Sequence, residues 1–149
     1  MRFILVDRIV SLSPGTEISA VRLIREDEDY FADHFPGFPV VPGVLLTEMM
    51  AQTAGKCLDA ERRARGKAML AKIVSASFRQ WVRPGDEVQL HAKITANDER
   101  YATADCLAQV GGRTAAQAKL FVTFLAPGNL AGDFRDQVLE DFLSKQPPT

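Results

Sequence analysis

The sequence is poor in cysteine and histidine, and this scarcity narrows the chemistry that the chain can perform. Its two cysteines, Cys57 and Cys106, do not form a CxxC pair. A disulfide framework needs more cysteines, so we expect two buried free thiols and a reducing, cytoplasmic location. The two histidines, His34 and His91, have no neighbours at metal-ligand spacing, and we predict no metal site.

Long apolar runs and an excess of charge of one sign are also missing. The N-terminal apolar stretch at 3–6 ends at Asp7, so it is shorter than the ~7–15 residues of a signal-peptide core. No stretch approaches the ~18 apolar residues of a membrane span. The formal net charge of −1 gives no general attraction to nucleic acid. We therefore predict a single domain over residues 1–149 that binds neither nucleic acid nor a membrane.

What the sequence does contain is a series of β-prone segments, separated by turn signals, around one long apolar segment. Residues 44–64 are rich in leucine, methionine and alanine, which predicts a buried helix. Apolar residues spaced by four within 133–144 predict a second, amphipathic helix. Extended segments are expected at 3–12, 16–24, 67–82, 87–95, 101–110 and 113–125. This order predicts an α+β fold in which a curled antiparallel sheet wraps around one helix.

A proline-rich segment, residues 34–43, leads into the long helix and is called the strap below. Pro36, Pro39 and Pro42 recur every three residues. Each fixes its own φ angle and biases the residue before it toward extended backbone, so we expect a stiff, extended strap that begins at His34. Gly43 lies at the helix start, where backbone N–H groups lack internal partners and a ligand oxygen could approach closely. Its amide is a candidate oxyanion site.

A carboxylate within the apolar helix is the second candidate group. Glu48 is flanked by Met49 and other apolar residues, and such surroundings favour the protonated form of a carboxyl group. A protonated carboxyl can act as a general acid, and Gln52, one turn further on, could orient it. Two plainer interpretations stay open: Glu48 could face solvent, and His34 could be a loop residue paired with Asp33.

The motif that carries these candidates resembles a known enzyme family. The stretch HFPGFPVVPGVLLTEMMAQ at 34–52 is similar to the β-hydroxyacyl-(acyl carrier protein) dehydratases of the FabZ type. SFRQWVRPGDEVQL at 77–90 and ILVDRIVSLSPGTEI at 4–18 support the resemblance. It implies the hot-dog fold and a homodimer, or a trimer of dimers. It also implies a lyase of fatty acid or related lipid biosynthesis, which removes water from 3-hydroxyacyl thioesters to give trans-2-enoyl thioesters without a cofactor.

The resemblance also assigns roles to individual residues. His34 matches the catalytic histidine of the family, and Glu48 matches its catalytic acid, which the neighbouring subunit supplies. Gly43 matches the glycine whose amide binds the thioester carbonyl. Beside these, we consider that the acyl chain could be lined by Phe35, Phe38, Met49 and Phe78, although each could equally be an ordinary core residue.

Two features of the sequence leave room for other functions. Asp33 stands where the family commonly has a small residue, and an adjacent carboxylate would favour the protonated imidazole and hinder its action as a base. Val41 replaces a common methionine, which is a milder change. The alternatives are a hot-dog acyl thioesterase and a non-catalytic acyl-binding hot-dog subunit in which Asp33 disables His34.

An acidic acyl carrier protein is the partner that the resemblance implies, and the sequence offers basic groups at two places that could steer its docking. The first follows the long helix and the second lies near the Pro-Gly-Asp turn. Each single charge is more often an ordinary solvated group. The two groups are Arg62, Arg63, Arg65 and Lys67, and Arg79 and Arg83.

Overall fold

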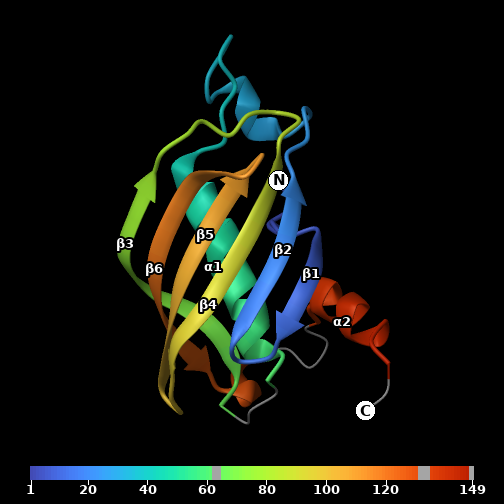
Figure 1. Ribbon diagram of the computed structural model, residues 1–149, viewed down its shortest axis with the longest axis vertical. Helices are drawn as coiled ribbons and strands as arrows, with labels where there is room; N and C mark the ends of the chain where they lie inside the picture. The colour runs from blue at the N-terminus through green and yellow to red at the C-terminus, as the bar shows by residue number, and fades with distance from the viewer. Residues whose placement is uncertain (62–64, 131–134, 148–149) are drawn as a thin grey trace.

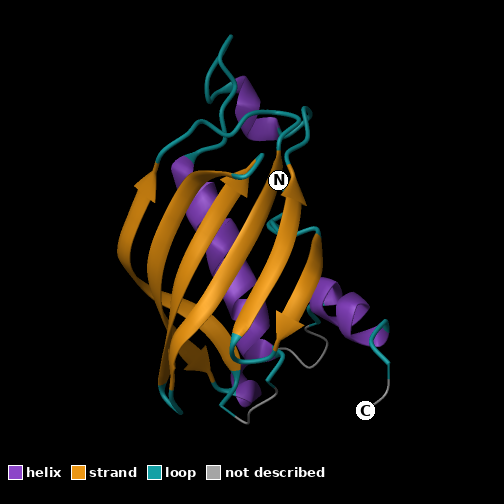
Figure 2. Cartoon of the chain, viewed as in Figure 1, coloured by secondary structure: helices purple, strands orange, loops and turns teal. Residues whose placement is uncertain are grey.

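The structure, a computed structural model, describes residues 1–61, 65–130 and 135–147. Its strands form one antiparallel sheet in the order β1-β2-β4-β5-β6-β3. Figures 1 and 2 show the sheet curling around the long helix α1, with α2 beside β1. The predicted α+β arrangement is therefore confirmed. The bounds are β1 Arg8–Ser13, β2 Glu17–Leu23, α1 Gly43–Asp59, β3 Lys67–Phe78, β4 Glu87–Asn97, β5 Tyr101–Val110, β6 Arg113–Leu125 and α2 Gln137–Ser144, with short 3-10 turns at Asp29–Ala32 and Pro127–Asn129.

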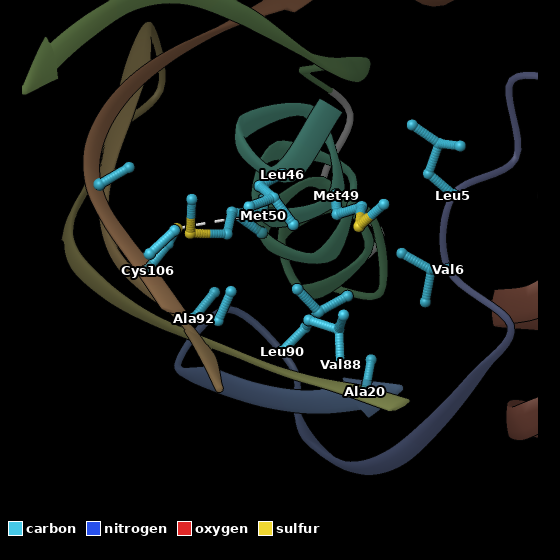
Figure 3. Packing of buried hydrophobic residues seen from close by; sticks show 14 of the residues in the cluster. Leu5, Val6, Ala20, Leu46, Met49, Met50, Val88, Leu90, Ala92 and Cys106 are labelled. Atoms are coloured by element: carbon cyan, nitrogen blue, oxygen red, sulfur yellow. Dashed lines mark hydrogen bonds between the residues drawn. The ribbon is translucent and has the colours of Figure 1, made fainter. Parts of the chain in front are cut away.

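Large side chains on α1 pack against small ones on the sheet. Leu46 and Met50 are buried on the helix, while the inward positions of β5 are occupied by alanines and Cys106. Figure 3 shows Met50 directed toward Cys106, and Met49 directed toward Leu5 in the N-terminal segment. Small residues let the sheet approach the helix closely, and the long helical side chains fill the space that remains.

Both cysteines are buried and free, as the sequence predicted. Burial raises the pKa of the Cys57 thiol to about 11 and that of Cys106 to about 12. Because the thiolate is the reactive form, these groups serve as small core residues.

α1 ends earlier than the sequence predicted, at Asp59. The Asp59 carboxylate accepts hydrogen bonds from the backbone N–H of Ala68 at 2.9 Å and from Lys67 Nζ at 2.6 Å. These contacts tie the helix end to the start of β3. The chain makes this connection through Gly66, which has a positive φ of 107°.

The edge strand β3 exposes apolar side chains along its length. It pairs with β6, and among the strands that the structure describes none pairs with its other side. Neighbouring positions in regular register, such as Met69 and Leu70, point to opposite faces of a strand, and both are exposed, at 46% and 40%. Apolar exposure on both faces of a long edge strand is unusual in a monomer. The exposed apolar residues are Met69, Leu70, Ile73, Val74 and Phe78.

The second helix, α2, is fixed at its start and along one face. Asp136 caps it by accepting a hydrogen bond from Leu139 N at 3.1 Å. The same carboxylate pairs with Lys56 on α1 at 2.8 Å. Leu139 is buried against the rest of the domain, and α2 contacts β1. The expected helix over 133–144 is confirmed over Gln137–Ser144, and residues 133 and 134 lie outside the described residues.

Gly66 provides a test of the connection between α1 and β3. A Cβ at this position would overlap the backbone oxygen of Leu125, and the positive φ is unfavourable for any L side chain. We expect Gly66→Ala to lower the free energy of unfolding by ~3 kcal/mol or more, measured by urea denaturation. Gly85 is the matched control, because it has φ +92° but open space around its Cβ position. Equal losses in Gly66→Ala and Gly85→Ala would contradict the steric explanation.

Candidate functional site

The strap is less extended than the three prolines predicted. Phe35 and Phe38 exchange backbone hydrogen bonds, with N to O distances of 3.1 and 2.9 Å. Between them, Pro36 fixes φ and Gly37 adopts a φ of +78°, a combination that favours a tight turn. The strap therefore folds back on itself before Val41 N donates to Val82 O at 2.8 Å.

This turn fixes the imidazole of His34. His34 Nδ1 lies 2.9 Å from the backbone oxygen of Val40, and Val40 N donates to His34 O at 3.1 Å. A carbonyl oxygen can only accept, so Nδ1 must carry the hydrogen of this bond. In the neutral imidazole this leaves the lone pair on Nε2, which is the form that a base requires. The His34 ring also stacks on Phe35, with centroids 4.1 Å apart, and the peptide bond between the two residues is cis.

The pairing of His34 with Asp33 is not formed among the described residues. Asp33 is exposed, whereas His34 is half-buried and contacts Val40 and Phe35. Adjacent residues in sequence thus have different surroundings.

Glu48 is half-buried on α1 and is held by Gln52, as the sequence suggested. Gln52 Nε2 donates to Glu48 Oε1 at 3.1 Å. The same amide group bonds the N-terminal segment, because its Oε1 accepts from Leu5 N at 2.9 Å and its Nε2 donates to Phe3 O at 3.0 Å. Gln52 therefore fixes the carboxyl group and the adjacent backbone together.

The Glu48 cavity, of about 360 Å³, is the space that this carboxyl group faces. Glu48, Gln52 and Lys56 line it from α1, at the four-residue spacing that places side chains on one face of a helix. The other walls come from distant parts of the chain. They are formed by Phe3, Ile4, Lys67, Arg135, Asp136, Gln137 and Val138.

At the start of α1, Gly43 faces an aromatic side chain. A Cβ at Gly43 would lie 3.1 Å from the ring of Phe78, which is tight for a carbon–carbon contact. The missing side chain therefore makes room for Phe78, and this is a structural reason for glycine beside the one inferred from the sequence. The loop that follows β3 lies at the same end of the sheet as the strap (Figure 1).

Together with Phe78 at the end of β3, this loop forms a basic aromatic surface around a hollow of about 560 Å³. The surface is defined here as Phe78, Arg79, Gln80, Trp81 and Arg83. Trp81 is 72% exposed and packs edge-on against Phe38, and the Arg83 guanidinium lies over the Phe38 ring at 4.7 Å. Arg79 and Arg83 were predicted as docking residues from the sequence, whereas Trp81, the single tryptophan of the chain, lies between them and was not.

The other basic group is largely neutralised where the structure describes it. Arg65 pairs with Glu61 and also contacts Asn97, and Lys67 pairs with Asp59. Arg62 and Arg63 lie outside the described residues.

Within one protomer, the predicted site residues form separate groups. His34, Phe35 and Phe38 belong to the strap, whereas Glu48 and Gln52 face the cavity beside the N-terminal segment. Met49 is 1% exposed and packs toward that same segment (Figure 3). The described contacts do not bring His34 and Glu48 together in one protomer.

Two further observations concern the described part of the chain only. It contains no group of three or more His, Cys, Asp or Glu side chains arranged to hold a metal ion. None of its helices has the length and apolar character needed to cross a bilayer.

Comparison with known proteins places the chain in a family. The model of the FabA-like domain matches residues 1–119. A 3-hydroxyacyl-[acyl-carrier-protein] dehydratase FabZ of Listeria welshimeri is 36% identical over 119 residues, which are 79% of this chain and 83% of that protein. The FabZ of Lactiplantibacillus plantarum is 39% identical over 116 residues, or 77% of this chain and 79% of that protein.

Solved structures of low sequence identity share the fold. The Streptococcus mutans protein smu.793, bound to acetyl CoA, has a TM-score of 0.65 at 12% identity and covers 85% of this chain and 94% of its own. The dehydratase heterocomplex ApeI:P of Xenorhabdus doucetiae has a TM-score of 0.58 at 20% identity and covers 77% and 96%.

The curled sheet, the enclosed helix and these neighbours define a hot-dog protein. Since the family model spans most of the chain and the FabZ relatives exceed a third in identity, the chain belongs to the FabA-like family.

Proposed function

We propose that this protein is a 3-hydroxyacyl-[acyl-carrier-protein] dehydratase, a lyase that forms trans-2-enoyl thioesters in fatty acid or related lipid biosynthesis. The observation that carries the proposal is the 34–52 motif, with an imidazole fixed by Val40 O and a carboxyl group fixed by Gln52. The FabZ relatives, which are named for this activity, support it. The carrier protein that bears the substrate would be its partner, in the cytoplasm.

The active site of this enzyme would be shared between two copies of the chain. His34 and Glu48 have different neighbours within one protomer, so a second copy must bring them within hydrogen-bond reach. The open edge of β3 supports such a dimer, because its exposed apolar residues would be buried and its free backbone groups paired. A trimer of such dimers is a further level of assembly in the same proposal.

The proposed reaction needs only groups of the chain itself. His34 Nε2 takes the proton from C2 of the 3-hydroxyacyl thioester, and charge develops on the thioester oxygen. The Gly43 amide at the start of α1 would stabilise that charge, an effect worth ~3 kcal/mol for one donor. Glu48 gives its proton to the 3-hydroxyl group, the C3–O bond breaks, and water and the trans-2-enoyl thioester leave. The proton on His34 then returns Glu48 to its acid form through solvent.

Thioester hydrolysis is the weaker alternative. A thioesterase would use a water molecule near Glu48 and has no need for an imidazole whose Nδ1 is held by a backbone oxygen. A non-catalytic subunit would need Asp33 to disable His34, yet the described Asp33 side chain makes no ion pair with it.

The carrier protein would dock on the basic aromatic surface. Arg79 and Arg83 are exposed there without a carboxylate partner in the described residues, whereas Arg65 and Lys67 are already paired. This surface also adjoins Gly43 through Phe78, so a substrate arm entering from it would be close to the start of α1. Charge complementarity of this kind mainly speeds association.

Complementation between inactive variants tests the shared site. We expect His34→Ala and Glu48→Ala each to lower the rate of enoyl formation by ~100-fold or more, because each removes a proton-transfer group. Unfolded and refolded together, the two variants should recover part of the wild-type rate, since a mixed dimer contains one intact pair. Absorbance of the enoyl thioester measures the rate.

The same assay separates the alternatives. Release of free thiol from acyl thioesters, without enoyl formation, would identify a thioesterase. Full turnover by His34→Ala would rule out the assigned base, and no recovery after mixing correctly folded variants would rule out a site shared between subunits.

Charge reversal tests the docking surface. Arg79→Glu with Arg83→Glu should raise KM for the carrier-protein substrate by ~10-fold, and the wild-type KM should rise with salt. KM for the same acyl group on a small pantetheine thioester should stay within about twofold, because this substrate does not need the docking surface. Lys93→Glu, on the exposed side of β4, is the control. An equal effect on both substrates would place the arginines in the acyl site instead.

A further inference from the structure

The segment at the start of α2 contributes a wall of the Glu48 cavity. Residues 135–138 line the cavity together with Glu48 and Gln52. They lie beyond residue 119, where the match to the FabA-like domain ends. This wall is therefore a feature of the chain that the family match does not account for.

The wall is held in place by a partly buried ion pair. Lys56 Nζ donates to both carboxylate oxygens of Asp136, at 2.9 and 2.8 Å, and the two side chains are only 9% and 16% exposed. Asp136 also caps α2 through Leu139 N, and Leu139 is buried. The position of the ion pair is thus fixed by the packing of α2 as well as by charge.

The ion pair lies on the line that an acyl chain would follow. In the proposed reaction, C3 of the acyl group lies at Glu48, so the carbons beyond C3 would enter the Glu48 cavity, which Lys56 and Asp136 also line. Glu48 and Lys56 are eight residues apart on one helix face, or ~12 Å along its axis. A chain that follows this face meets Lys56 and Asp136 at its far end.

Contact with such an ion pair contributes little favourable binding free energy to a hydrocarbon chain. Methylene groups packed against the ion pair would remove its remaining water without replacing any hydrogen bond, and this costs free energy. Shorter chains would end beside Phe3, Ile4 and Gln52 before reaching the charges. The wall would therefore favour short acyl chains over long ones.

We infer that the Lys56–Asp136 ion pair, held by α2, limits the acyl chain that this enzyme accepts to short and medium lengths. The inference rests on the proposed dehydratase function. It assigns to the C-terminal segment a role in specificity in addition to its role in packing.

A chain-length series tests this inference. Hydration of four-, eight- and twelve-carbon trans-2-enoyl thioesters is followed for the wild type and for Lys56→Met with Asp136→Asn. This double variant removes both charges, while the asparagine oxygen can still accept from Leu139 N. We expect kcat/KM of the wild type to fall by ~10-fold or more from four to twelve carbons, and the double variant to recover most of this loss.

Lys119→Met with Asp105→Asn is the matched control, because this pair on the exposed side of the sheet is 3.9 Å apart and about half exposed. Its chain-length profile should equal that of the wild type. A wild type equally active on twelve carbons, or a folded double variant with an unchanged profile, would overturn the inference and leave the dehydratase proposal standing. No activity on any chain length would overturn the dehydratase proposal itself. If the double variant does not fold, the chain-length profile of the wild type can still overturn the inference, because equal activity on four and twelve carbons would contradict it.

Discussion

The packing of α1 into the concave face of the sheet is the constraint on which the rest of the structure depends. The helix contributes bulky side chains such as Leu46 and Met50, and the strands facing it contribute alanines and Cys106. Because the helix has the large side chains and the strands have the small ones, the sheet can curl closely around the helix. Because α1 contacts five of the six strands, Gly43 at its start and Glu48 further along it have fixed positions relative to the strap and the N-terminal segment.

Where local signals are strong, the sequence predicts the elements well. The strands at 101–110 and 113–125 have the predicted bounds, since Gly111 and Gly112 form the two-residue turn between them and both have positive φ. The end of α1 was predicted too late, because Asp59 reaches across to Ala68 N, a contact between segments that no local pattern contains. The strap was predicted to be extended throughout, and this was wrong at Pro36 and Gly37, which form a turn within it.

The candidate site could be predicted as a set of residues but not as an arrangement. The motif pointed to His34, Glu48 and their neighbour Gln52, and the structure adds how each is held. What the sequence could not indicate is that Gln52 also binds the backbone at Phe3 and Leu5, or that Asp136 reaches Lys56. Such contacts join segments far apart in the chain, and only the fold brings them together.

The open edge of β3 has a consequence for how the protein reaches its final state. A single newly folded chain carries a twelve-residue strand with unpaired backbone groups on one side and apolar side chains on both faces. Such an edge accepts any strand that can add to it, so a correct copy competes with misfolded chains for the same hydrogen bonds. In the dimer proposed above a second copy would cover this edge, so the chain would be most prone to aggregate before it meets its partner.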